Sequence, residues 1–172
     1  MANNKDTAPA PTAEITREGL INNLNGDLAR EYKAIIAYVV YSQVLTGAKY
    51  MSIAKTLEKH AKEELSHALI IAEQIDYLGG DPTVTPEAVK TSDNADEMLR
   101  FDLENEKQTI LNYRQRVRDC ESLGEYAMAE HIREILVDEQ DHFIALSTAL
   151  GIDPPNLDQD KARNKNQPGQ KK

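Results

Sequence analysis

The chain has 172 residues, a formal net charge of −9, one cysteine and no tryptophan. This length allows one domain with a sizeable core, and the abundance of Ala, Leu, Glu and Lys beside only 8 Gly favours an all-α fold. The negative charge disfavours generic binding to nucleic acids and anionic membranes, and a single cysteine excludes both a disulfide within the chain and a metal site of clustered cysteines.

Hydropathy gives an expectation about location. The sequence contains no run of about 18 apolar residues, so no membrane-spanning helix is predicted. The polar N-terminal stretch also lacks the apolar core of a secretory signal. We therefore expect a cytoplasmic protein with no membrane partner.

The first half of the chain reads as an arm, two helices and a loop. Residues 1–13 are polar and carry two prolines, which predicts a disordered arm. Apolar residues at helical spacing follow over about 16–46 and again over about 49–78, where a Gly-Gly pair ends the pattern. Residues 81–93 show no long apolar pattern, so we expect a loop. About 15 extended residues can span a helix of about 30 residues from end to end.

The second half repeats the pair of helices. A third helix is predicted to begin near Asp93 or Asn94, either of which can cap it, and to run to about Leu123. A fourth covers about 125–150 and stops at a glycine. Short, long and short connections predict an antiparallel four-helix bundle with one long crossover between helices 2 and 3.

The predicted bundle occupies residues 14–150 and leaves 151–172 as a flexible, polar and basic tail. Multiplied over an oligomer, such a tail can contact DNA phosphates. The net negative charge favours a merely solvated tail, so we do not expect DNA as a partner. The basic residues near its end, with no acidic residue among them, are Lys161, Arg163, Lys165, Lys171 and Lys172.

A short motif repeats on two of these helices. Glu64-x-x-His67 in the first half of the chain returns in the second half as Glu139-x-x-His142. Residues three apart in a helix share one face, so each motif directs a carboxylate and an imidazole at one point. Because both motifs interrupt the apolar stripe of their helix, we expect these side chains on the buried face.

The other two helices carry one glutamate each on the apolar stripe, Glu31 and Glu106. The number of residues from Glu31 to Glu106 is the same as the number from one Glu-x-x-His motif to the other. A buried carboxylate costs several kcal/mol unless its charge is compensated. Two divalent cations would neutralise four carboxylates, so the pattern predicts a buried di-metal site. Its ligands are expected to be Glu31, Glu64, His67, Glu106, Glu139 and His142.

The donor types narrow the choice of metal. Carboxylates and imidazoles without thiolates suit iron or manganese, and zinc can also bind. Two redox-active ions can pass electrons to O2 or H2O2, whereas zinc cannot change its oxidation state. Two iron ions per subunit are therefore the expected cofactor.

This ligand pattern resembles the bacterioferritin branch of the ferritin-like superfamily over about residues 16–150, and the stretches 96–103 and 135–142 strengthen the likeness. The resemblance implies a ferritin-like fold and a ferroxidase centre in which Glu64 and Glu139 bridge the irons. It also implies oxidation of Fe2+ by O2 or H2O2, with storage of Fe3+ mineral in a homo-oligomeric cage.

Tyr38 lies on the same apolar stripe as Glu31, and Tyr113 lies on the same stripe as Glu106. The interval between the two tyrosines equals the interval between the two glutamates. The resemblance implies that Tyr38 lies beside the di-iron centre as an electron donor or hydrogen-bond partner. Tyr113 is its counterpart in the second half, and the sequence allows either simple packing or a role at the centre.

Three departures from the bacterioferritin pattern refine these expectations. Leu65 stands where haem-binding members carry a methionine, so we expect no haem. The sequence after Leu150 cannot form the short fifth helix of 24-subunit cages, so a twelve-subunit cage of the mini-ferritin type is favoured. His60 replaces a carboxylate one turn before Glu64; with Glu63 it could form an accessory iron site, or it could be a histidine hydrogen-bonded inside the bundle.

The alternative function is a di-metal oxidoreductase that stores no iron, such as a rubrerythrin-like peroxidase or a manganese catalase. Rubrerythrins typically add a site with four cysteine ligands, which one cysteine cannot supply. A structural or vestigial site is a third possibility, against which the complete ligand set argues.

Overall fold

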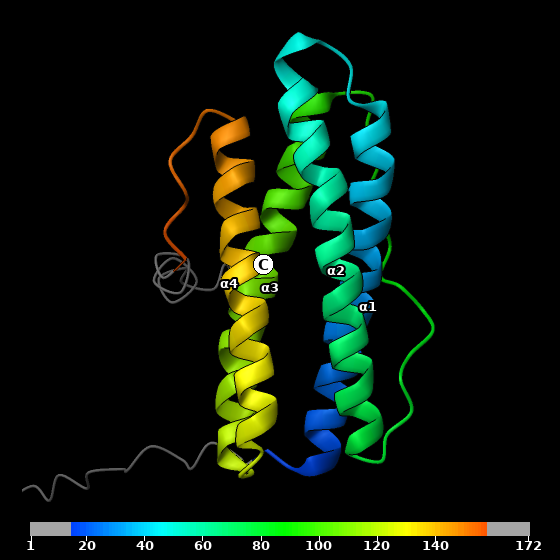
Figure 1. Ribbon diagram of the computed structural model, residues 1–172, viewed down its shortest axis with the longest axis vertical. Helices are drawn as coiled ribbons and strands as arrows, with labels where there is room; N and C mark the ends of the chain where they lie inside the picture. Colours follow the sequence, from blue (N-terminus) through cyan, green and yellow to red (C-terminus); the bar gives the residue numbers. More distant parts are fainter. Residues whose placement is uncertain (1–14, 158–172) are drawn as a thin grey trace, which may run out of the picture.

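The computed structural model describes residues 15–157 (Figure 1). Within this range all regular structure is helical, which confirms the predicted fold class. None of the described helices combines the length and hydropathy needed to cross a bilayer. The elements in chain order are α1 (Arg17–Val44), the short 3-10 helix η1 (Ala48–Tyr50), α2 (Met51–Tyr77), α3 (Ala95–Ser122) and α4 (Tyr126–Ala149).

Two of the helices begin where a capping side chain is available. Thr16 Oγ1 accepts a hydrogen bond of 3.0 Å from the backbone N–H of Gly19. At the start of α3, Asn94 Oδ1 accepts one of 3.1 Å from Glu97 N–H, so Asn94 rather than Asp93 is the cap. Each bond satisfies a backbone donor that has no partner inside its helix.

Two antiparallel hairpins, α1 with α2 and α3 with α4, form the bundle (Figure 1). Residues 78–94 connect them and run the length of the bundle beside α1. Near the start of this crossover Thr83 N–H donates to Asn25 Oδ1 at 2.7 Å. Near its end the Tyr41 hydroxyl donates to the carbonyl of Lys90. The predicted single long crossover is confirmed.

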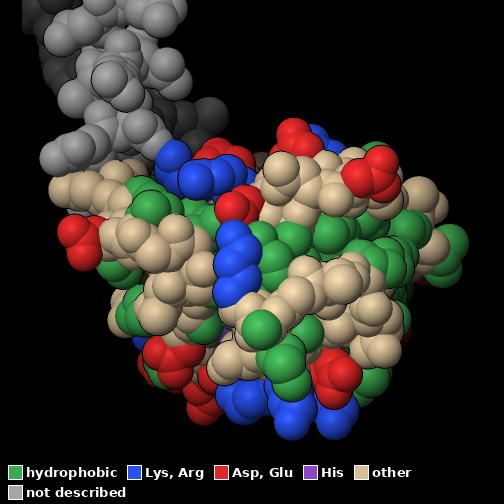
Figure 2. All heavy atoms as spheres, turned by 90° about the horizontal axis from the view of Figure 1, so that it is seen from above, with side chains coloured by type: hydrophobic (Ala, Val, Ile, Leu, Met, Phe, Trp, Pro, Cys, Tyr) green, Lys and Arg blue, Asp and Glu red, His purple; other side chains and the backbone are tan. Residues whose placement is uncertain are grey.

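Polar side chains divide the core into two apolar clusters. The cluster toward the start of α1 contains Cys120, a fully buried free thiol. From the opposite end, hydrophobic side chains show between the helices, with acidic and basic ones around them (Figure 2). The first cluster includes Leu20, Leu24, Leu28, Ile71, Met128 and Ile132, and the second includes Tyr41, Ile53, Leu57, Leu99, Phe143 and Leu146.

Two predictions about the ends of the chain stay predictions. The arm at 1–13 and the basic residues of the tail lie outside the described residues. Residues 151–157 follow α4 without forming a helix, so a fifth helix does not begin directly after the bundle.

Candidate metal centre

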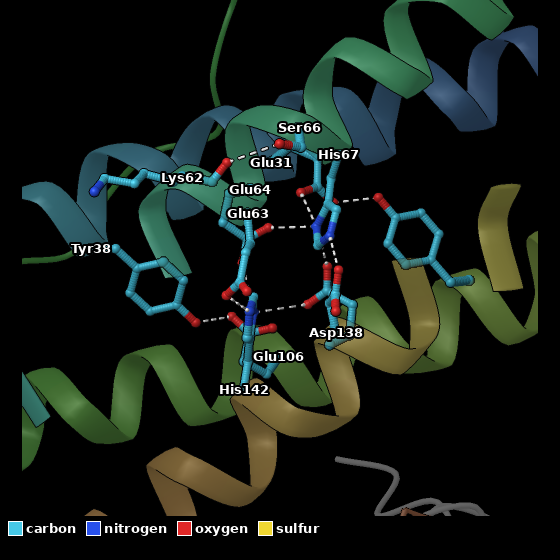
Figure 3. A network of polar contacts seen from close by, with 12 residues as sticks. Glu31, Tyr38, Lys62, Glu63, Glu64, Ser66, His67, Glu106, Asp138 and His142 are labelled. Carbon is cyan, nitrogen blue, oxygen red and sulfur yellow. Dashed lines mark hydrogen bonds and ion pairs between the residues drawn. The ribbon is translucent and has the colours of Figure 1, made fainter. Parts of the chain in front are cut away.

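The six predicted ligands come together near the middle of the four helices, between the two apolar clusters. Figure 3 shows Glu31, Glu64, His67, Glu106 and His142 of this group from close by. Each of the four helices contributes at least one of them, and all are buried. Their exposed fractions are at most 2%, for Glu31, Glu64, His67, Glu106, Glu139 and His142.

The six side chains form two overlapping groups of donor atoms. One comprises Glu31, Glu64, His67 and Glu139, and the other Glu64, Glu106, Glu139 and His142; within each group the donors lie within 4.8 Å of one another. Glu64 and Glu139 belong to both groups. This arrangement offers two neighbouring cation positions that share two carboxylates, as the predicted bridging roles require.

Both imidazoles direct Nδ1 at the shared carboxylates. His67 Nδ1 lies 3.1 Å from Glu64 Oε2 and 3.2 Å from Glu139 Oε1. His142 Nδ1 lies 3.0 Å from Glu64 Oε1 and 3.8 Å from Glu139 Oε2. The two Glu-x-x-His motifs therefore face each other across the bundle, each histidine meeting the glutamate of the other motif.

The outer nitrogen of each imidazole contacts a further carboxylate. His67 Nε2 donates to Asp138 Oδ2 at 3.2 Å, and His142 Nε2 donates to Glu63 Oε2 at 3.1 Å. Carboxylates in this position fix the orientation of metal-binding histidines and raise their basicity. Sequence reasoning missed the role of Asp138, although an acidic residue directly before the glutamate of each motif was an available signal.

Two buried tyrosines hold the unshared glutamates. The Tyr38 hydroxyl, on α1, donates to Glu106 Oε1 on α3. The Tyr113 hydroxyl, on α3, donates to Glu31 Oε1 on α1. Tyr38 thus lies beside the centre, as the resemblance implies, and Tyr113 makes the equivalent hydrogen bond.

Several buried polar atoms of the centre make no well-directed hydrogen bond, although Glu64 Oε1 and Glu139 Oε1 each lie within 3.2 Å of an imidazole nitrogen. Leaving such an atom unsatisfied costs about 1–3 kcal/mol, more when it is charged. A coordinated cation would satisfy them, and carboxylate and imidazole donors suit divalent iron or manganese. The residues therefore fit a pair of such cations. The unpartnered atoms are Glu31 Oε2, Glu64 Oε1, Glu106 Oε2, both oxygens of Glu139, and His142 Nδ1.

Protons balance the charge of the centre when cations are absent. Burial raises the pKa of Glu64 to about 8, and the charge of Glu31 acts in the same direction. Burial also raises the pKa of Glu139 well above its usual range. Burial opposes the charge of His142, but the surrounding carboxylates, Glu64 first, raise its pKa to about 9. A cation that binds here must therefore displace protons.

Other buried polar residues near the centre escaped the sequence reading, which followed only the apolar stripes. Asp102 is 4% exposed, and burial, followed by the charge of Glu106, raises its pKa well above the usual range. Arg116 Nε donates to Asp27 Oδ2 at 2.7 Å, which joins α3 to α1. Asp102, Arg116 and Asp27 lie one helical turn from Glu106, Tyr113 and Glu31, respectively. This spacing was the only feature of the sequence that could have indicated their burial.

The family of ferritin-like domains matches residues 21–152. A related protein, the bacterioferritin of Desulfovibrio desulfuricans, is 30% identical over 143 residues, which cover 83% of this chain and 75% of that protein. The family match and this relative agree with the resemblance inferred from the ligand pattern.

Solved structures agree with this assignment. A ferritin-like di-iron carboxylate protein from Bacillus anthracis is 31% identical, with a TM-score of 0.76 over 81% of this chain and 99% of that chain. A bacterioferritin-related dodecameric thioferritin from Bacteroides fragilis is 26% identical, with a TM-score of 0.73 over 88% of this chain and 91% of that chain. The predicted ferritin-like form of the bundle is confirmed.

Proposed function

The chain belongs to the family of ferritin-like domains, and from this premise we propose that it is a ferroxidase that stores iron. It oxidises Fe2+ with O2 or H2O2 and holds the Fe3+ as mineral inside an oligomeric cage. The observation that carries this proposal is the convergence of four glutamates and two histidines from four helices on one buried point (Figure 3).

The two groups of donor atoms indicate which residues would hold each Fe2+ ion. Glu31 and His67 would hold one Fe2+, Glu106 and His142 the other, and Glu64 and Glu139 would be shared. The two ions supply two electrons, which with two protons reduce O2 to H2O2 or H2O2 to water. Manganese or zinc could occupy the same donors, but only a redox-active metal supports this reaction.

The protein's own contribution is orientation, exclusion of water and control of protons. Asp138 and Glu63 fix the two imidazoles through their outer nitrogens. The Tyr38 hydroxyl directs its proton at Glu106 Oε1 and is placed to give up that proton, or an electron, to the reaction. Because burial raises the pKa of Tyr38 well above its usual range, the phenol keeps its proton until the reaction takes it.

The assembly and its surroundings complete the proposal. A hollow assembly is needed to enclose mineral, and a twelve-subunit cage is proposed from the absence of a helix in residues 151–157 and from the dodecameric relative. A cytoplasmic location, as the sequence predicts, belongs to the same proposal. The absence of haem rests on Leu65 and stays a prediction.

The direct test is Glu64→Ala, which removes a carboxylate common to both donor groups. We expect rapid Fe2+ oxidation to be lost while helical circular dichroism is retained. Glu73→Ala on the exposed face of the same helix is the matched control and should oxidise iron at the wild-type rate. An unchanged oxidation rate in the Glu64 variant would refute the assignment.

Tyr38→Phe tests the role of the phenol. Removal of the hydroxyl leaves Glu106 in place but takes away its hydrogen-bond donor, so we expect slower or redirected oxidation with an unchanged metal content. Tyr113→Phe removes the equivalent donor from Glu31 and serves as the comparison. Stopped-flow oxidation and metal analysis of both variants give the answer, and loss of metal from the Tyr38 variant would show that its role is structural.

A further inference from the structure

A second group of possible ligands lies next to the di-metal centre, between α2 and α4. His60, Glu63 and His142 each offer one donor atom, and these atoms lie within 4.8 Å of one another. His60 is 3% exposed, and its Nδ1 has no hydrogen-bond partner. The Glu63 side chain is 24% exposed, so the group is reachable from solvent on that side.

His142 belongs to both the centre and this second group. Its Nδ1 lies 3.0 Å from Glu64 Oε1, while its Nε2 lies 3.1 Å from Glu63 Oε2. The ring of His60 stacks on that of His142, with centroids 3.8 Å apart. The other oxygen of Glu63 pairs with Lys59 at 2.6 Å, and that lysine is 72% exposed. The Lys59 side chain can therefore move away from Glu63 without loss of packing.

The internal repeat shows that His60 is not needed to orient His142. Asp138 is the counterpart of Glu63, and it contacts His67 Nε2 at 3.2 Å. The residue at the position that corresponds to His60 is Ile135, which is 1% exposed. An apolar side chain is sufficient there. By contrast, the buried Nδ1 of His60 has no hydrogen-bond partner, which costs free energy of folding that an apolar side chain would not cost. This difference indicates that a ligand binds beside His60 and not beside Ile135.

We propose that His60, Glu63 and Nε2 of His142 form a third cation site, which takes a divalent first-row metal such as Fe2+ or Zn2+. Two imidazoles and one carboxylate with open positions for water form a ligand set that both non-haem iron and zinc use in proteins. The site lies between solvent and the di-metal centre, which His142 adjoins through its other nitrogen. If both of its nitrogens bound cations, the ring would have to release its remaining proton to water.

This inference rests on the proposed function in one respect, the role of His142 at the centre. Zn2+ tests it without any oxidation chemistry. Crystals of the full chain equilibrated with Zn2+ should show anomalous scattering at the di-metal centre and a further peak beside His60 and Glu63. His60→Ile copies the other half of the repeat and should lose that further peak alone, with one zinc ion fewer per chain in equilibrium dialysis.

Asp138→Asn is the matched control, because it removes an orienting carboxylate on the side that lacks the extra histidine. The peak beside His60 should persist in this variant. If His60→Ile does not fold, Glu63→Gln removes the carboxylate of the site instead and should abolish the same peak. The absence of the peak in the wild-type protein, or its persistence in His60→Ile, overturns the third site. A zinc peak beside His60 in a protein that does not oxidise Fe2+ would instead overturn the proposed function.

Discussion

Each buried carboxylate of the centre contacts a histidine or a tyrosine, or carries a proton. Tyr38 and Tyr113 donate to the two unshared glutamates. The shared glutamates face Nδ1 of His67 and His142. This pairing offsets part of the cost of burying four acids in a domain whose net stability is only about 5–15 kcal/mol, and the carboxylate oxygens without a hydrogen-bond partner carry the rest. The same groups would become the ligands of the proposed cations once their protons leave.

Metal affinity should therefore depend on pH in a defined direction. In the metal-free protein the pKa values of Glu64, about 8, and His142, about 9, mean that both groups carry protons at neutral pH. Since a cation must displace these protons, the affinity should rise with pH through this range.

Calorimetric titration with Zn2+ in buffers of different ionisation enthalpy measures the number of protons released. We expect net release at about pH 7 that is smaller in Glu64→Ala, which lacks one of the protonated groups. Equal heats in all buffers would contradict this description of the metal-free centre.

At the scale of the helices, a buried ionic group joins α1 to α3 in the half of the bundle nearer the start of α1. Arg116 Nε lies 2.7 Å from Asp27 Oδ2, and its Nη1 pairs with Asp119. The Arg116 side chain is 7% exposed and that of Asp27 is 3% exposed. Removal of one member of such a group leaves a buried charge without a partner.

Arg116→Met should lower the free energy of unfolding by about 3–5 kcal/mol, toward the lower value because burial raises the pKa of Asp27 and so helps it to take up a proton. Arg118→Met on the exposed face of the same helix is the control and should change stability by less than about 0.5 kcal/mol. Denaturant unfolding of the two variants makes the comparison. Similar midpoints would show that the buried group contributes no more than a surface charge.

At the scale of the whole molecule, several apolar side chains on α1 and α2 stay exposed in the single chain. Val39 is 51% exposed, Leu65 52% and Leu69 65%. Exposed apolar surface of this kind suits contact with further copies of the chain. Iron storage needs a hollow assembly, whereas a di-metal oxidoreductase that stores nothing does not.

Native mass spectrometry should therefore give twelve times the mass of one chain, which is 19.3 kDa. Loading with Fe2+ in air should raise the mass further as mineral collects. A monomer or dimer would exclude storage and favour the peroxidase or catalase alternative, while a 24-subunit mass would keep storage and correct only the subunit number.

The sequence by itself determined the helices, their order and the six residues of the centre. Apolar residues at helical spacing locate a helix, and a charged residue that interrupts such a stripe is directed to the interior whatever the neighbouring helix does. The repeat of the Glu-x-x-His motif at Glu64 and Glu139 then related the two halves. These inferences depend only on distances along one chain segment.

Only the tertiary structure decided which side chains meet across helices. The pairing of Asp138 with His67, the hydrogen bond from Tyr113 to Glu31, and the burial of Arg116 between α1 and α3 all join different helices. Such contacts depend on how far each helix is rotated about its axis and shifted along its neighbour. Packing of the whole core fixes both quantities, whereas a pattern along one helix shows only which face a residue lies on and not which partner it contacts.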